Sequence, residues 1–347
     1  MSKLPKRTLI IDVSNILFRV AVRQKRTNAP GMSDLDPQEL VAFCMHMSLQ
    51  SIYKWFNKIK PDFVVFAFEG GNNWRKTYSA VNNVRRQYKA NRTRDPAMDH
   101  FYKLIDSFQE VVTKHTSICC LSVEGMEADD TIAAYCQLTS APDHEIYIVS
   151  GDKDFIQLTK DAQVKLVDPD TGKLRNQPGD KDYEEDLDYW LFLKCVRGDS
   201  GDNVPSAYPR VFSTKVKEAF LDPYKKLNFM NTRWTDENKV EHRVGDLFEH
   251  NLVLVGLDKQ PDEIRARLLE ETMAQTEQIG SYSHFHFLKF LGEYKLKRVA
   301  EEVTKFVTMF TNNQRFRKGE QVSAHEVVRV TPSQPKQPEV NTSGLVF

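Results

Sequence analysis

The amino-acid sequence predicts an α/β fold, in which a central, mostly parallel sheet is flanked by helices, with a smaller C-terminal helical lobe and a flexible tail. In the first part of the chain, short runs rich in β-branched and aromatic residues alternate with amphipathic segments of helical length. This alternation is typical of a parallel α/β sheet. Beyond about Pro205 the strand signals stop and helical patterns follow one another. A last stretch rich in Pro, Ser, Gln and Thr lacks the apolar residues needed to bury a core.

Each predicted element has its own pattern. Strands are expected at three short apolar runs, residues 8–11, 63–68 and 145–149. Apolar residues recur near helical spacing in the segments expected to cover the sheet, residues 37–58 and 126–138. The same spacing marks the helices of the C-terminal lobe, residues 213–220, 244–254, 261–273 and 293–310. We therefore expect an α/β domain over residues 1–203, a helical lobe over 204–312 and the tail over 313–347.

Composition limits the class of protein. The 347 residues include 48 Lys and Arg and 48 Asp and Glu, and this zero net charge excludes a uniformly basic nucleic-acid coat. The five cysteines show neither a disulfide framework nor zinc-ligand spacing, which favours a reducing compartment. No stretch approaches the roughly 18 uninterrupted apolar residues of a membrane helix, and the first residues do not form a signal-peptide pattern. We expect a monomer that has no membrane anchor and is located in the cytoplasm.

Acidic residues follow the predicted strands at the point where each strand ends. Asp12 follows the first strand, Glu69 the second, and Asp152 and Asp154 the third. In open α/β sheets, ligands bind beyond the C-terminal ends of the strands. We therefore expect these carboxylates to converge on one site, although they come from distant parts of the chain.

Further acids lie at a predicted helix start and in a turn that contains glycine. Glu127, Asp129 and Asp130 begin the helix, and Asp199 and Asp202 lie in the turn. Any one of these acids could simply cap a helix or favour its dipole, but this does not account for the whole set. Converging carboxylates repel one another, and hard oxygen ligands select magnesium or manganese. Two such ions about 4 Å apart activate a water and stabilise a phosphodiester's attacking and leaving oxygens, so the pattern predicts a two-metal nuclease.

These motifs resemble the flap endonuclease and 5′→3′ exonuclease family, and within it the ribonuclease H branch of T-even bacteriophages. The motifs are LIIDVSNILFR at 9–19, VEGMEADD at 123–130, SGDKDFIQL at 150–158 and GDSGDN at 198–203. The resemblance implies a PIN-like nuclease domain with two Mg²⁺ ions, for which Mn²⁺ substitutes. It implies that Asp12, Glu127, Asp129, Asp152 and Asp154 hold the ions directly or through water. Asp130, Asp199 and Asp202 would then complete the site of the second ion or support the ligands from behind.

The chain departs from the family pattern at two places. Glu69 stands where the family usually has Asp, and its longer side chain would hold a metal either directly or through a water. After Asn203 the chain lacks the glycines of the family's helix-hairpin-helix. We therefore do not expect that motif's potassium site in the helical lobe, and duplex binding by this lobe depends on the resemblance alone.

A basic segment lies between Trp74 and Lys103. Eight basic and two acidic residues give it a local charge of +6, and aromatic residues are interleaved with them. The segment could be a solvated basic face, but its composition also suits contact with phosphates and stacking on unpaired bases. The resemblance implies a mobile arch at about 72–97, in which Lys89 and Arg92 are catalytic residues that hold the scissile phosphate. Further nucleic-acid contacts are then expected from Arg75, Lys76, Arg85, Arg86, Tyr88 and Arg94.

The function expected from this resemblance is that of a Mg²⁺-dependent 5′→3′ exonuclease and flap endonuclease. It would remove RNA primers from RNA·DNA hybrids, and adjacent DNA, during replication. Two alternatives are a PIN-like endoribonuclease, which usually lacks the basic arch and the helical lobe, and a catalytically silent protein that binds structured nucleic acid. Glu69 is the one hint in the sequence for the silent protein.

The C-terminal residues suggest a partner. Leu345, Val346 and Phe347 end the polar tail, and they are either a frayed terminus or a peptide that docks into a sliding clamp. A tether of this kind raises the effective concentration of the peptide. A single-strand-binding protein is a further candidate partner.

Overall fold

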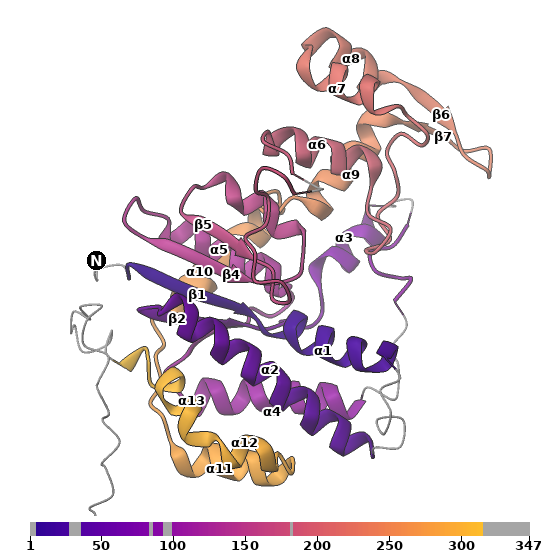
Figure 1. The fold of residues 1–347 in the computed structure, drawn as a ribbon. Coiled ribbons are helices and arrows are strands. Elements are labelled where there is room, and N and C mark those ends of the chain that lie inside the picture. The colour runs from indigo at the N-terminus through magenta and orange to yellow at the C-terminus, as the bar shows by residue number, and fades with distance from the viewer. Residues whose placement is uncertain (1–4, 28–35, 83–85, 93–98, 181–182, 315–347) are drawn as a thin grey trace, which may run out of the picture.

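The computed structural model describes residues 5–27, 36–82, 86–92, 99–180 and 183–314, and a parallel sheet between two layers of helices forms its centre (Figure 1). The five strands lie in the order β3-β2-β1-β4-β5, and each neighbouring pair is parallel. Their bounds are Arg7–Asp12 (β1), Phe63–Ala67 (β2), Cys119–Leu121 (β3), Glu145–Val149 (β4) and Val164–Val167 (β5). The three predicted strands are confirmed. The two outer strands were not predicted, because their three or four residues are too short to show a pattern.

The central strands are buried on both faces, as expected for a parallel sheet covered by helices. Ile10 of β1 pairs with Val65 of β2 and with Ile148 of β4, and all three are fully buried. Successive side chains of a strand point to opposite faces. Leu9 and Ile11 accordingly belong to one core and Ile10 to the other.

One face of the sheet is covered by helices from both ends of the chain. These are α1 (Val13–Thr27), α2 (Pro37–Ile59), α4 (Asp99–His115), α11 (His284–Glu293), α12 (Lys297–Glu301) and α13 (Val303–Phe310). Phe108 of α4 lies between Phe66 of β2 and Phe290 of α11, with ring centroids 6.3 and 6.0 Å apart. The C-terminal helices therefore complete the core of the α/β domain.

The opposite face carries α5 (Ala128–Thr139), the short helix η2 (Asp154–Lys160) and α10 (Asp262–Thr276). Ile132 of α5 packs with Val65 and Ile148 in the second core. Leu268 of α10 packs with Ala134 of α5. The start of α5 thereby lies against the C-terminal edge of the sheet.

A separate lobe stands at the top of Figure 1. It consists of α6 (Leu187–Arg197), α7 (Ser213–Leu221), α8 (Pro223–Asn231), α9 (Val244–Val255) and the hairpin β6–β7 (Arg233–Thr235 and Glu241–Arg243). Phe192 of α6 packs with Phe229 and Phe248 in the lobe's own core. The hairpin was not predicted, since strands of three residues carry no periodicity.

The cores divide the chain differently from the expected boundaries. The lobe begins with α6, before residue 203, and the helices after α9 return to the α/β core. The helix expected over 293–310 is interrupted where Lys295 adopts a left-handed φ of 52°. Asn313, expected at the start of the tail, is fully buried and both accepts from and donates to the backbone of Val64, each at 2.8 Å. Residues 315–347 of the expected tail, with Leu345 to Phe347, lie outside the described residues.

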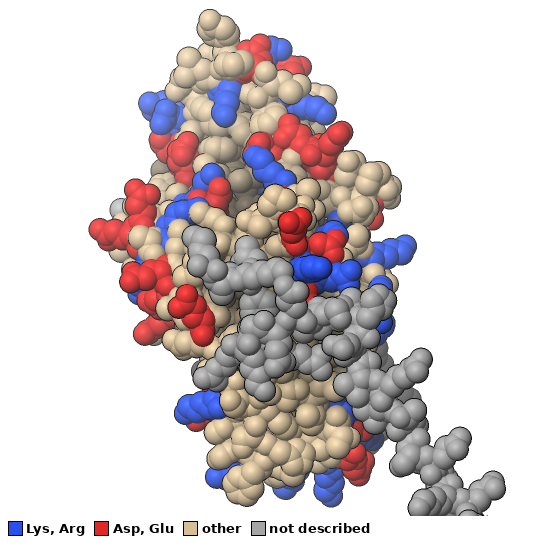
Figure 2. Space-filling model, turned by 90° about the vertical axis from the view of Figure 1, so that its left-hand side faces the viewer, with Lys and Arg blue, Asp and Glu red and all other residues tan. Residues whose placement is uncertain are grey.

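The surface and the helices show two further properties. Figure 2 shows acidic and basic side chains interspersed over one side of the molecule. The charges on this side therefore do not gather into one large acidic or basic patch. Within the described parts of the chain, none of the helices is both long enough and apolar enough to cross a bilayer.

Candidate active site

A pocket of about 820 Å³ opens beside the C-terminal ends of β1, β2 and β4. Six of the predicted carboxylates line it: Asp12, Glu69, Glu127, Asp129, Asp152 and Asp202. They come from five separate segments of the chain, and the topology of the sheet brings them together. This convergence is what the positions of the acids after the strands predicted.

Asp12 ends β1 and is held by two hydrogen bonds. Its Oδ1 accepts from the backbone N–H of Asn15 at 3.1 Å, and its Oδ2 accepts from the hydroxyl of Ser150 at 2.8 Å. Only 6% of the residue is exposed. Burial and the charge of Asp152 raise the pKa of Asp12 to about 6, although the two hydrogen bonds and Lys89 oppose this shift.

Glu69 lies two residues beyond β2, and one of its oxygens accepts from the backbone N–H of Ala128 at 3.3 Å. Desolvation in the pocket wall, together with the charges of Glu127 and Asp12, raises the pKa of Glu69 to about 7. The residue is exposed at the pocket opening, and the solvent there weakens these interactions. Glu69 therefore lies in the pocket wall, just beyond the C-terminal end of β2.

Two of the three acids at the start of α5, Glu127 and Asp129, line the pocket but have different partners. Glu127 is the N-cap residue and forms a capping box with Asp130. Asp129 faces the pocket, where one of its oxygens is buried without a hydrogen-bond partner among the described residues. Burial and the neighbouring charges of Glu127 and Asp130 raise the pKa of Asp129 well above its usual value.

Asp130 points away from the pocket, contrary to the expectation that it holds a metal. It is fully buried, and its two oxygens each accept a hydrogen bond of 2.7 Å from the guanidinium of Arg75. They also accept from Trp74 Nε1 at 3.1 Å, Gln260 Nε2 at 3.0 Å and the backbone N–H of Glu127 at 3.1 Å. A carboxylate with its lone pairs committed in this way has no oxygen left for a cation.

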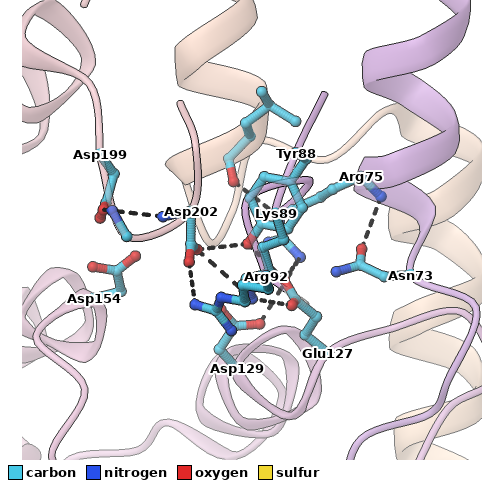
Figure 3. Close-up of polar contacts among 12 residues, drawn as sticks. Asn73, Arg75, Tyr88, Lys89, Arg92, Glu127, Asp129, Asp154, Asp199 and Asp202 are labelled. Atoms are coloured by element: carbon cyan, nitrogen blue, oxygen red, sulfur yellow. Dashed lines mark hydrogen bonds and ion pairs between the residues drawn. The ribbon is translucent and has the colours of Figure 1, made fainter. Parts of the chain in front are cut away.

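Arg75 was expected to contact a phosphate, and the structure contradicts this. Its side chain is 1% exposed. Besides Asp130, it donates to Glu127 Oε2 at 3.1 Å and to the carbonyl of Leu254 at 2.9 Å (Figure 3). Arg75 belongs to α3 (Trp74–Val81), so it joins the base of the basic segment to the start of α5.

Tyr88 also differs from the expectation, because a ring that stacks on bases must be accessible. Only 4% of Tyr88 is exposed. Its hydroxyl lies 2.9 Å from an oxygen of Glu127 and 2.8 Å from an oxygen of Asp202 (Figure 3). One hydroxyl proton can serve only one of these carboxylates at a time. Tyr88 therefore orients two of the predicted ligands.

Lys89 and Arg92 lie over the carboxylates, as Figure 3 shows. The ammonium of Lys89 contacts Glu127 and lies 3.7 Å from Asp202, and Arg92 bonds to Asp202. The backbone of Lys89 has a left-handed φ of 54° and donates to the carbonyl of Asp202 at 2.8 Å. Both cations line the pocket, so they are placed where a bound phosphate would meet them.

Asp154 and Asp199 lie to one side of this cluster in Figure 3 and do not line the pocket. Both bond to the ammonium of Lys194 on α6, at 3.1 Å in the case of Asp199. Burial raises the pKa of Asp154 to about 6, and Lys194 only partly offsets this. Lys194 was missed by the sequence analysis, since a lysine inside an amphipathic helix carries no signal.

The remaining predicted contacts have two different outcomes, and one pocket residue was not predicted. Lys76 and Arg86 are exposed, as a contact with nucleic acid requires. Arg85 and Arg94 lie outside the described residues. Arg19, to which no role was assigned, lines the pocket and forms an ion pair with Asp170. Asn15 and Arg19 are four residues apart, so they lie on the same face of α1, and this face borders the pocket. Their spacing was visible in the sequence and could have predicted it.

The donor set of the pocket fits a hard divalent cation. Among the described residues, no three His, Cys, Asp or Glu side chains form a ready-made cage for a metal ion. The lining nevertheless presents carboxylate oxygens, among them those of Asp129, one of which accepts no hydrogen bond from the described residues and lies 3.9 Å from the guanidinium of Arg75. Oxygen ligands of this kind select Mg²⁺ or Mn²⁺ over softer metals.

We expect Asp12→Asn to stabilise the metal-free protein at pH 8 but not at pH 4. Because the pKa of Asp12 is raised to about 6 in the folded protein, its contribution to stability is present below pH 3.8 and is lost as the pH rises through 6. The neutral amide removes this loss, which we put at about 3 kcal/mol of unfolding free energy. Urea unfolding in EDTA at both pH values measures it. The exposed Asp258→Asn is the control, and equal stability of wild type and Asp12→Asn at pH 8 would contradict the prediction.

The fold and the pocket together define a class of protein. A parallel sheet gathers carboxylates from several segments at its C-terminal edge, below a basic segment, and in open α/β sheets this edge is where ligands bind. Residues 7–186 match the family described as 5′-3′ exonuclease, N-terminal resolvase-like domain, which is more than half of the chain. The chain therefore belongs to the 5′→3′ exonuclease and flap endonuclease family, whose members are nucleases and hence hydrolases.

Curated relatives are DNA polymerases. DNA polymerase I of Lactococcus lactis is 25% identical over 316 residues, covering 85% of this chain and 33% of the polymerase. DNA polymerase I of Rhizobium leguminosarum is 32% identical over 168 residues, covering 45% of this chain and 15% of the polymerase. The chain thus spans a third or less of the length of these relatives.

Solved structures of bacteriophage T5 proteins share the fold. A T5 protein co-crystallised with metal ions superposes with a TM-score of 0.54 at 16% identity, covering 78% of this chain and 100% of the T5 chain. The T5 flap endonuclease in a pseudo-enzyme-product complex with DNA and metal ions gives a TM-score of 0.51 at 16% identity, with the same coverage. At this identity the likeness shows a common fold.

Proposed function

We propose that the protein is a Mg²⁺-dependent 5′→3′ exonuclease and flap endonuclease, which removes RNA primers from RNA·DNA hybrids, and adjacent DNA, during replication. The observation that carries the proposal is the pocket itself. It gathers six of the predicted carboxylates from five segments and places Lys89 and Arg92 beside them. Membership of the nuclease family supports the same activity.

Divalent ions would be held by the predicted carboxylates that face the pocket: Asp12, Glu69, Glu127, Asp129, Asp152 and Asp202. When bound, such ions supply Lewis-acid chemistry that generates a nucleophilic water and stabilises the leaving oxygen. Mn²⁺ is expected to substitute for Mg²⁺, since both prefer oxygen ligands.

The chain's own cations would position the phosphate. Lys89 and Arg92 are bonded to Glu127 and Asp202, and a phosphate entering the pocket would exchange these partners for its own oxygens. A fixed cation close to a phosphate stabilises the charge that accumulates in the transition state. The buried Arg75 and Tyr88 would hold Glu127 in place while this exchange occurs.

The proposed substrates follow from the relatives and from the resemblance of the motifs. A T5 flap endonuclease of the same fold has been crystallised with DNA and metal ions, which supports a DNA substrate. RNA primer removal depends on the resemblance to the phage ribonuclease H branch. We also propose cytoplasmic action as a monomer, with a sliding clamp bound through residues 345–347 and a single-strand-binding protein as candidate partners.

The test is digestion of a 5′-labelled RNA·DNA hybrid and a 5′-flapped DNA duplex. We expect short 5′ products in Mg²⁺ and in Mn²⁺, and none in EDTA or with Asp152→Asn. Asp258→Asn, an exposed aspartate outside the pocket, is the matched control and should retain wild-type activity. Tight binding of the flap without cleavage in either metal would instead favour the catalytically silent protein, and endonucleolytic cleavage of RNA without a 5′ end would favour a PIN-like endoribonuclease.

A further inference from the structure

Lys194 is a half-buried lysine whose ammonium pairs with two predicted metal ligands. It lies inside α6, and its side chain is 14% exposed. Its ammonium bonds to Asp154 and, at 3.1 Å, to Asp199. The ring of Trp190, one helical turn earlier, lies 5.4 Å from the same ammonium and restricts it further.

The two carboxylates are also fixed by their own loops. Asp154 begins η2 and donates its backbone N–H to Asp152 at 2.9 Å. One oxygen of Asp199 accepts from the backbone of Gly201 at 2.8 Å and of Asp202 at 3.3 Å, which leaves the other oxygen to Lys194. The pair therefore presents a small anionic site that an ammonium already fills.

This arrangement differs from that of Lys89 and Arg92. Those two cations lie in the turn 86–92, outside any helix, and they border the open pocket. Lys194 extends from the last turn of a helix whose next residues, Cys195 and Val196, are fully buried in the lobe's core. A ligand can displace a side chain in an open pocket more easily than one held by a packed helix.

We propose that Lys194 is a built-in counter-cation of the Asp154–Asp199 pair and a positioning residue that weakens the binding of a second divalent ion there. The protein then binds one divalent ion tightly in the carboxylate pocket and a second one weakly. The inference rests on the proposed function, because it assumes that the pocket takes a divalent ion. An ammonium at hydrogen-bond distance from both carboxylates competes with a divalent ion for the same oxygens.

The test is a titration of the full chain with Mn²⁺, followed by electron paramagnetic resonance, without nucleic acid. For Lys194→Met we expect the weak site to bind Mn²⁺ more tightly, by on the order of tenfold or more, because the positive charge beside Asp154 and Asp199 is removed. Lys160→Met is the matched control, since Lys160 also joins η2 to α6 through Asp188, in a pair that is exposed. It should bind Mn²⁺ as the wild type does.

Two further measurements keep the test decisive if Lys194→Met folds poorly. Lys194→Gln, which is neutral but still donates hydrogen bonds, should also bind Mn²⁺ more tightly at the weak site. Thermal unfolding should show a larger rise of Tm with Mn²⁺ for either variant than for wild type. If the variants keep the tight Mn²⁺ site but their weak sites bind Mn²⁺ no more tightly than those of the wild type, the inference alone is overturned. If the wild type itself has no tight Mn²⁺ site, the proposed function is overturned as well.

Discussion

Asp129→Asn is expected to lower the rate of cleavage by about 10³-fold while leaving the protein folded and stable. Asp129 faces the pocket with a buried oxygen that no described residue bonds. An amide binds a divalent ion poorly, and a loss of about 4 kcal/mol of transition-state stabilisation corresponds to this factor. Single-turnover cleavage of the 5′-flapped duplex measures the rate, and urea unfolding in EDTA measures the stability.

Its neighbour supplies the control, since Asp130→Asn should behave in the opposite way. Asp130 is fully buried against Arg75 and does not reach the pocket. Its replacement should cost stability, and the remaining folded protein should keep most of its cleavage rate. If Asp129→Asn cleaved at the wild-type rate, or if Asp130→Asn alone abolished cleavage in the folded protein, the assignment of the two acids would be reversed.

These adjacent acids show what the sequence could and could not establish. The positions of Asp12, Glu69 and Asp152 after the predicted strands predicted their convergence, because the C-terminal ends of parallel strands lie at the same edge of the sheet. The motif at the start of α5 offered three acids without saying which ones face the pocket. Their directions follow from the capping geometry and from the cation that meets Asp130, and that cation comes from a segment more than fifty residues away.

The basic segment shows the same limit. Its composition predicted contacts with nucleic acid, but a composition does not distinguish a cation that faces a ligand from one that is buried against acids. Lys89 and Arg92 border the pocket, whereas Arg75 is part of the core. Lys194 had no signal at all, because its partners lie on η2 and on a loop that only the fold brings to α6.

Arg75→Met is expected to lower the free energy of unfolding by about 3–5 kcal/mol, the usual cost of leaving a buried carboxylate unpaired. The guanidinium is 1% exposed, and Asp130 opposite is fully buried. Methionine fills much of the volume but donates no hydrogen bonds, so Asp130 and Glu127 lose their shared counter-charge. Urea unfolding, followed by circular dichroism, measures the change.

The double variant Arg75→Met/Asp130→Leu distinguishes a structural role from a contact with substrate. Because it removes the unpaired charge together with its partner, it should recover part of the stability that Arg75→Met loses. A phosphate contact predicts the opposite pattern, with stability unchanged and flap affinity reduced in the single variant. Since every guanidinium donor of Arg75 with a described partner points to the start of α5 or to the carbonyl of Leu254, we expect the structural pattern. The arginine then orders the base of the basic segment, and through it the position of Lys89.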